Sequence, residues 1–215
     1  IVAAGPAANL VLAVLLYAAA QWVGVQEPKA VLSAPMAETP AERAGLRSGD
    51  WVREWSEDGM NWRPVQSLSD LRWLATDAAM EGRRLHLAVS DRQGKGRREL
   101  VLDAAAVQAR DVDAQLMRRL GLGAPFSEPL LGEVKAEGPA AAAGLRAGDR
   151  VLRVDDVPIA DAQALRERIR QSVRGDTGVP MRWRVERAGQ VLDLSVTPKV
   201  VAGQGADAAP IGRIE

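Results

Sequence analysis

Few residues of this chain belong to the types that carry out enzyme chemistry. The 215 residues include no cysteine and one histidine, His86. This composition excludes a thiol nucleophile, a thiolate zinc site and an HExxH zinc motif within the sequence. His86 stands between two leucines in an alternating segment, so we expect a strand residue that faces solvent rather than a metal ligand.

The adjacent carboxylates Asp155 and Asp156 are a second candidate, because paired carboxylates can perform acid–base catalysis. They follow the strand-like run 150–154, where short polar residues commonly form a turn. We therefore expect a structural turn at this position. Lys+Arg and Asp+Glu are equal at 28 each, and this balance argues against a general nucleic-acid-binding protein.

The elements that could position functional residues begin with an apolar run. No charged side chain precedes Glu27, and a membrane crossing needs about 20 apolar residues. The run therefore predicts a transmembrane helix over residues 1–25. Two alternatives are a signal peptide, since residues 18–20 are all alanine, and a buried core helix. The chain has neither a starting Met nor basic residues before the run, which argues against the signal peptide.

The remainder of the chain contains a duplication. Residues 40–50 (PAERAGLRSGD) match residues 139–149 (PAAAAGLRAGD) at a constant offset of 99. The pattern predicts a short helix that begins at proline and ends at glycine, a buried leucine, and a Gly-Asp turn into a strand. A period this long indicates tandem domains rather than a solenoid.

Each copy continues with a helix and a hairpin. The helices are expected at about 69–80 and 161–174, the second with Asp161 as its N-cap and Gly175 as its stop. On the first of these helices, we expect Trp73 to pack beside its neighbouring leucines and the loop residues Trp55 and Trp62 to be the better candidates for surface contact. Alternation of apolar and polar residues then predicts two antiparallel strands in each copy.

This order of elements resembles the bacterial type of PDZ domain, with the second copy (143–159, AGLRAGDRVLRVDDVPI) matching better than the first. The resemblance implies a mixed α+β fold, in which each PDZ-like unit is a small antiparallel β-sandwich or barrel with two helices. Its implied boundaries are a transmembrane helix (1–25), PDZ-like domain 1 (26–108), PDZ-like domain 2 (116–200) and a tail (201–215) that leads to a further membrane segment.

A Gly-Pro-x-x-Asn motif (Gly5, Pro6 and Asn9) in an apolar helix, followed by two PDZ-like units, resembles the site-2 intramembrane zinc proteases, in the regulator-of-sigma-E protease branch. In that family the HExxH and a further aspartate ligand lie on other membrane helices. The resemblance therefore implies a non-catalytic part of a zinc metalloendopeptidase, with no cofactor in this chain and zinc in the whole enzyme. It also implies the bacterial inner membrane, with the PDZ tandem in the periplasm.

PDZ grooves bind the end of an extended chain by strand addition beside a helix, with a glycine-containing loop that cradles the carboxylate. The resemblance places this loop just before the second unit. The expected peptide-binding residues are Leu120, Gly121, Leu122 and Gly123 in the loop, and Leu165 and Ile169 on the helix wall. For the two helix residues, plain core packing is an equally good interpretation, because an apolar helical stripe usually faces a core.

The leading hypothesis is a tandem that gates or binds substrates of regulated intramembrane proteolysis in the envelope stress response, with anti-sigma-factor-type proteins as the substrates that the family implies. The expected partners are a membrane-protein substrate or a peptide C-terminus and the lipid bilayer, without nucleic acid. Peptide binding and size exclusion remain open as mechanisms. The alternative is a membrane-anchored PDZ scaffold of a secretion or envelope complex without protease activity.

Overall fold

The computed structural model describes residues 4–23, 27–107, 115–203 and 210–214. The apolar run forms helix α1 (Ala4–Val23), as its lack of charge and of strand periodicity predicts. Residues 8–18 of this helix are all exposed, so the alternative of a buried core helix is wrong.

Of the expected transmembrane segment (1–25), the structure describes residues 4–23, as helix α1. Within the ranges that the structure describes, no helix combines the length and the apolar character needed to cross a membrane.

The first unit is built on a four-stranded antiparallel sheet with the order β2-β1-β3-β4. Its strands are β1 (Trp51–Ser56), β2 (Arg63–Pro64), β3 (Arg84–Ser90) and β4 (Arg98–Asp103). Its helices are α2 (Pro40–Arg43), α3 (Leu68–Met80), the 3₁₀ helix η1 (Ala104–Val107) and α4 (Leu116–Leu120). The predicted helix at 69–80 is confirmed, and Ser67 caps it by accepting a hydrogen bond from the N–H of Asp70.

The second unit repeats this sheet, with the order β10-β9-β5-β6. It contains β5 (Arg150–Val154), β6 (Val157–Pro158), β9 (Met181–Arg187) and β10 (Gln190–Val196), with helices α5 (Pro139–Ala142) and α6 (Ala162–Arg170). Two small ribbons complete it: β7 (Val173–Arg174) with β8 (Thr177–Gly178), and β11 (Lys199–Val201) with β12 (Ile211–Arg213). Helix α6 ends four residues earlier than expected, because residues 173–174 pair as a strand instead of continuing to Gly175.

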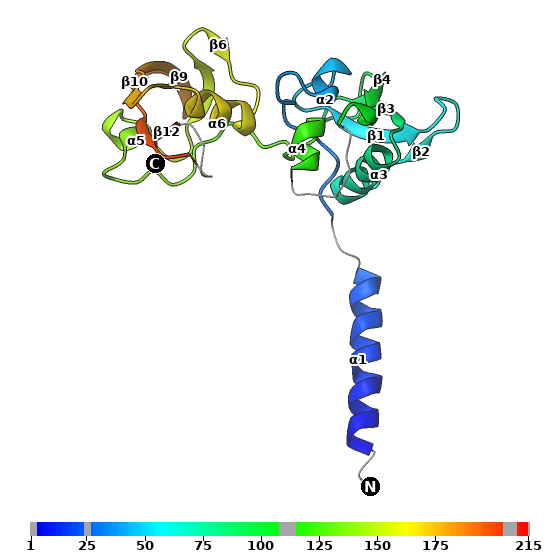
Figure 1. Cartoon of the computed structure of the whole chain (residues 1–215). Coiled ribbons are helices and arrows are strands. Elements are labelled where there is room, and N and C mark those ends of the chain that lie inside the picture. The colour runs from blue at the N-terminus through cyan, green and yellow to red at the C-terminus, as the bar shows by residue number, and fades with distance from the viewer. Residues whose placement is uncertain (1–3, 24–26, 108–114, 204–209, 215) are drawn as a thin grey trace.

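The backbone confirms the duplication in detail. The first β-bulge falls between Val52 and Glu54 and the second between Val151 and Arg153, again at the offset of 99. Gly45 and Gly144 both adopt the left-handed conformation, with φ of 85° and 81°, directly after the short helices. The two units lie side by side, each with its own sheet and helices (Figure 1).

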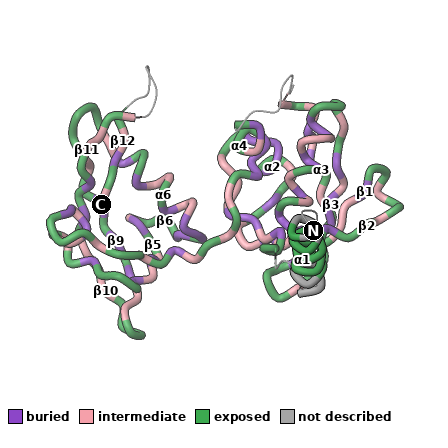
Figure 2. Tube along the Cα trace, turned by 90° about the horizontal axis from the view of Figure 1, so that it is seen from below, coloured by how far each residue is buried: buried purple, intermediate pink, exposed green. Residues whose placement is uncertain are grey.

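Two separate clusters of buried apolar side chains form the cores, and Figure 2 shows buried segments within each unit. Leu116, Leu120 and Leu122 belong to the first cluster, so this segment packs into the first unit, although we expected residues from 116 onward in the second. Ile214 packs against the second cluster, which extends that unit beyond residue 200 into the expected tail.

The repeated leucine after each short helix is a core residue, as predicted. Leu46 is 5% exposed and Leu145 is 3% exposed. We expect Leu145→Ala to cost about 2–5 kcal/mol of unfolding free energy, because it would leave a cavity in the core cluster that also contains Trp183. Chemical denaturation monitored by tryptophan fluorescence measures this loss. An unchanged denaturation midpoint would contradict the core assignment, and the exposed Leu130→Ala serves as the matched control.

Candidate peptide-binding sites

The Leu-Gly-Leu-Gly run lies at the end of α4 in the first unit. Gly121 ends this helix with φ of 88°, and the N–H groups of Gly121 and Leu122 donate to the carbonyls of Arg118 and Met117 at 3.0 and 2.8 Å. These two donors therefore close the helix and are not free to cradle a carboxylate. Within the described residues, the N–H of Gly123 has no hydrogen-bond acceptor.

The two leucines of the run do not border a pocket as expected. Leu120 is 0% exposed and Leu122 is 1% exposed, and both pack in the first core. Gly121 fits tightly against α2, since a Cβ at this position would lie 2.7 Å from the Cβ of Ala41 and would clash with Thr39. The Leu-Gly-Leu-Gly run therefore contributes to the packing of the first unit in addition to forming a loop.

The chain after this run extends the first unit. The N–H of Phe126 donates to the carbonyl of Val31 at 2.9 Å, and the N–H of Ser33 donates to the carbonyl of Ala124 at 3.2 Å. From α3, Arg72 donates to the carbonyl of Gly123 at 3.1 Å. A glycine-containing loop, an extended segment and a helix, which are the parts of a PDZ groove, therefore meet within the first unit.

The outer edge of this extended segment offers few backbone groups for strand addition. Pro125 has no N–H to donate, and Arg72 already occupies the carbonyl of Gly123. Among the described residues of this segment, the N–H of Gly123 is a donor without a backbone partner within the unit. Peptide binding here would depend more on side chains around the loop than on a long ladder of main-chain hydrogen bonds.

The predicted helix wall of the second unit is core. Leu165 and Ile169 are 5% and 9% exposed and belong to the second cluster. Both are therefore core residues, which was the second of the two interpretations of this helix stripe. Strand β12 packs directly on this helix: a Cβ on Gly212 would lie 2.8 Å from Ser172 Oγ and would clash with the carbonyl of Ile169. The space that a peptide would need between α6 and β12 is filled.

A pocket of about 260 Å³ lies between the two units. It is lined by Ser33, Ala34, Met36, Arg118, Gly121, Gly123, Ala124, Gln163 and Arg170. The structure thus brings Gly121 and Gly123 close to the helix that we expected beside them. They meet α6 through Gln163 and Arg170, however, and not through Leu165 and Ile169, which point into the second core.

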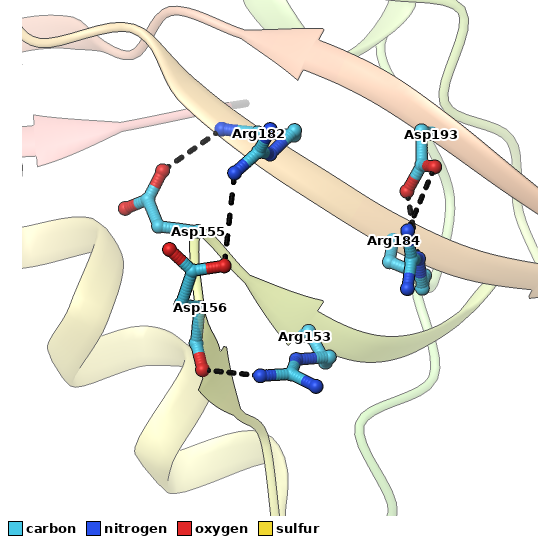
Figure 3. A pocket seen from close by; sticks show the side chains of 6 residues that line it. All are labelled: Arg153, Asp155, Asp156, Arg182, Arg184 and Asp193. Atoms are coloured by element: carbon cyan, nitrogen blue, oxygen red, sulfur yellow. Dashed lines mark hydrogen bonds and ion pairs between the residues drawn. The ribbon is translucent and has the colours of Figure 1, made fainter.

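The pair Asp155 and Asp156 lies in an ionic cluster on the second sheet (Figure 3). Asp155 accepts from the N–H of Arg182 at 3.0 Å and from Arg168 Nη2 at 2.7 Å. Burial opposes ionisation of Asp155, but these hydrogen bonds outweigh it and hold the pKa of the carboxyl below its usual value. A carboxylate that is ionised and paired in this way stabilises the strand-end turn and is poorly suited to donate a proton near neutral pH.

The other groups of this cluster are paired as well. Arg184 binds both oxygens of Asp193, at 2.8 and 3.0 Å, and Arg153 donates to the carbonyl of Asp156 at 2.6 Å. These charges lie on neighbouring strands, where opposite charges stabilise cross-strand pairing. We therefore assign the cluster a structural role in the sheet.

His86 is half-buried rather than fully solvated, because the loop at Gly59 folds over its ring; a Cβ on that glycine would lie 3.1 Å from His86 Nδ1. Where the structure describes the chain, no three His, Asp or Glu side chains are grouped closely enough to hold a metal ion. The described residues therefore do not form a zinc centre.

The expectation that Trp73 packs beside its neighbouring leucines is wrong, whereas Trp55 and Trp62 are both partly exposed. Trp73 is 68% exposed on α3, because Leu71 and Leu74 occupy the buried face of that helix. Trp55 packs against the first core and carries Arg63 over its ring at 5.4 Å. Arg97 lies 4.9 Å from the ring centre of Trp62, a cation–π contact.

Sequence reasoning missed two buried carboxylates and their arginine partners. Asp50 is bound by Arg98 Nη2 at 2.5 Å, and Asp149 by Arg187 Nε at 2.6 Å. The signal for both was present in the repeat, since each aspartate closes a Gly-Asp turn. The arginines lie in the hairpins, where nothing in the sequence distinguishes them from surface charges.

Comparison with known proteins identifies relatives of the whole chain. A sequence profile of the PDZ domain family matches residues 107–197. An inferred zinc metalloprotease of Ralstonia nicotianae is 38% identical over 77% of this chain and 36% of its own length. An inferred zinc metalloprotease of Neisseria meningitidis is 33% identical over 100% of this chain and 45% of its own length.

The regulator of sigma-E protease RseP of Escherichia coli is 27% identical over 95% of this chain and 44% of its own length. The chain therefore spans less than half the length of these curated relatives. At 95% of this chain, the match includes residues of both sheet-containing units. The chain belongs with the RseP-like zinc metalloproteases of the site-2 protease family, as a segment that contains a PDZ domain.

Proposed function

We propose that this chain is the non-catalytic PDZ tandem of a membrane-embedded zinc metalloprotease that carries out regulated intramembrane proteolysis. The tandem controls which substrates reach the protease, by binding a peptide end or by excluding large extracytoplasmic domains. The enzyme lies in the bacterial inner membrane with the tandem in the periplasm, and its substrates are membrane proteins of the anti-sigma-factor type. Zinc is held by parts of the enzyme outside this segment.

The observation that carries this proposal is the arrangement around Gly123. A loop, an extended segment and helix α3 meet there beside a pocket of about 260 Å³, in a chain related throughout to RseP-like proteins. The alternative of a scaffold without protease activity lacks such support, because two of these relatives are named as zinc metalloproteases and a third as the regulator of sigma-E protease.

The proposal is tested with the gene that encodes this chain, expressed at full length with an epitope-tagged membrane substrate. Deletion of residues 27–214 is expected to change cleavage seen by immunoblot. A size filter predicts new cleavage of substrate whose outer domain is intact, whereas a binding site predicts weaker cleavage of the trimmed substrate. Unchanged cleavage of both forms, or a gene without an HExxH motif, would contradict the proposal and favour the scaffold.

A further inference from the structure

A second hollow, of about 380 Å³, lies on the first unit and shares no lining residue with the pocket at Gly123. It is formed by the Gly-Asp turn that follows α2 and by the loop that leads from β3 into β4. Helix α2 and strand β4 lie side by side (Figure 1). The basic residues on the wall of the hollow are Arg47 from the turn, Arg92 and Lys95 from the loop, and Arg98 from β4. Among the described residues that line the hollow, none has an apolar side chain.

The loop beside this hollow is an addition to the duplicated unit. In the second unit, residues 188–189 join β9 and β10 in a tight turn that carries no charge. In the first unit, the pairing of β3 with β4 ends at Val89 and Arg98, and residues 90–97 (SDRQGKGR) connect them. Since a tight turn is sufficient to connect two such strands, the fold does not require the longer loop. Its basic side chains are therefore available for a role other than closing the hairpin.

Both carboxylates on the wall are already bound within the protein. Asp50 is buried, and it is held by the guanidinium of Arg98 at 2.5 Å and by the N–H of Arg47 at 2.8 Å. Asp91 closes the loop, because its Oδ1 accepts from two N–H groups of the loop, at 2.7 and 2.9 Å. The charge of Asp50 is therefore offset by Arg98, and within the described residues neither carboxylate forms an ion pair with the side chain of Arg47 or Lys95.

Three cations remain for a ligand, and one of them is held in place. Within the described residues, the side chains of Arg47 and Lys95 form no ion pair. The guanidinium of Arg92 lies 4.4 Å from the ring centre of Phe126 and 3.3 Å from Glu128, a carboxylate that a second arginine binds at 2.7 Å. Glu128 is thus shared between two arginines and offsets the charge of Arg92 only in part.

The wall of the hollow favours a compact anion with several oxygens. Like charges around one hollow repel one another, so an anion between them is stabilised. The wall offers arginine, lysine and the amide of Gln93 as donors, and a peptide end would find no contact there for an apolar side chain. A phosphate group suits this wall, since its oxygens and its charge of about −2 accept charge-assisted hydrogen bonds from more than one cation.

We propose that this hollow is a binding site for a phosphate-type anion, with Arg47, Arg92 and Lys95 as its contacts. A free phosphate and the phosphate of a lipid headgroup offer the same chemistry. A bound anion links the turn after α2 to the loop 90–97. The site lies on the first unit alone, so it depends neither on peptide binding nor on proteolysis.

The test uses the whole chain in micelles of an uncharged detergent, at constant ionic strength and without other multivalent anions. Inorganic phosphate is titrated by isothermal calorimetry, and the wild type should show saturable binding. The titration is repeated after phosphatidic acid, or phosphatidylcholine as its control, has been mixed into the micelles. Loss of phosphate binding with phosphatidic acid alone supports the site with a lipid headgroup as its source. Unchanged binding with both lipids supports the site with the free anion as its source.

Two variants test the residues. We expect Lys95→Glu to weaken phosphate binding about tenfold or more, which is 1.4 kcal/mol or more. Its melting temperature should not change, because Lys95 is exposed and forms no ion pair within the described residues. The matched control is Lys199→Glu, the same charge change at an exposed residue of β11 that does not line the hollow, and it should leave the affinity nearly unchanged. Arg47→Gln, on the other side of the hollow, should also weaken binding.

Three results would overturn the proposal. The first is a wild type without saturable phosphate binding at millimolar concentration. The second is equal weakening by Lys95→Glu and Lys199→Glu, because net charge and not the hollow would then attract the anion. The third is wild-type affinity in Arg47→Gln, which would remove the turn from the site. None of these results touches the proposed control of substrates, which concerns the other pocket and the size of the tandem.

Discussion

Gly121→Ala should destabilise the first unit by about 3 kcal/mol, although it adds a single methyl group. Gly121 has a φ of 88°, a conformation that costs an L-residue roughly 1–2 kcal/mol. The added Cβ would also lie 2.7 Å from the Cβ of Ala41 and clash with Thr39, and overpacking of this kind costs about 1–3 kcal/mol. Thermal unfolding followed by circular dichroism should show a clearly lower first transition.

The control is the other glycine of the same run. A Cβ on Gly123 would meet only the Cγ of Arg118 at 3.7 Å and the Cα of Arg118 at 4.0 Å, which are ordinary contacts, and its φ is not in the left-handed region. Gly123→Ala should therefore leave the melting temperature within about 3 °C. Equal effects of the two substitutions would show that α4 does not pack against α2 as described.

A difference between the Gly121 and Gly123 substitutions would distinguish a packing role of the Leu-Gly-Leu-Gly run from a peptide-binding role. The sequence pattern suggests that a bulkier residue at Gly121 blocks ligand approach and leaves the fold intact. The structure predicts loss of stability instead, because Gly121 ends α4 and lies in close contact with Thr39 and Ala41 at α2. A loss of peptide binding in a Gly121 variant would report unfolding of the first unit, so Gly121 is a poor residue for testing the groove.

The repeated motif allowed much of each unit to be predicted. Gly45, Leu46 and their counterparts Gly144 and Leu145 adopt the conformation and burial that their types require, because a glycine after a short helix and a leucine after that glycine have few alternatives. The alternating residues of β9 are likewise buried and exposed in turn, as period two demands. Local sequence patterns were therefore sufficient to predict the residues whose conformation and burial depend on their neighbours along the chain.

The assignment of residues 116–123 could not be made in this way. The run lies between the two copies along the chain, and the PDZ profile also includes it with the second copy. Its leucines fit either core by type, and which core they enter depends on packing with Thr39 and Ala41, which lie far away in the sequence. In the same manner β12 completes the second unit from beyond its last long hairpin. Long-range packing of this kind leaves no local signal.

The residues of the candidate site could likewise be predicted from the sequence only in part. Gly121 and Gly123 could be selected from their type and spacing, and the structure does place both on a pocket. Gln163 and Arg170 could not, because their role depends on the angle between the units. Asp161, which the sequence identifies only as a helix cap, also accepts a hydrogen bond from the N–H of Ala34 in the first unit.

Arg187→Ala should lower the melting temperature of the second unit by about 10 °C at pH 7. Asp149 is fully buried, and Arg187 binds its two oxygens at 2.6 and 2.7 Å. Removal of the arginine leaves a buried carboxylate whose remaining hydrogen bond is donated by the N–H of Arg146 at 2.9 Å. The matched control is Arg184→Ala on the same strand, because its bond to Asp193 is exposed and its loss should change the melting temperature by less than about 3 °C.

The pH dependence of this loss identifies its cause. The hydrogen bond from Arg187 holds the pKa of Asp149 below its usual value despite burial of the carboxyl. Because the folded-state pKa is the lower one, the pair stabilises the fold above the ordinary aspartate pKa of about 4, and this stabilisation is lost as the pH falls further. The difference in melting temperature between wild type and Arg187→Ala should therefore be largest near pH 7 and narrow below pH 4. A difference that stays constant from pH 7 to pH 3 would mean that Arg187 acts through packing of its side chain and not through the charge of Asp149.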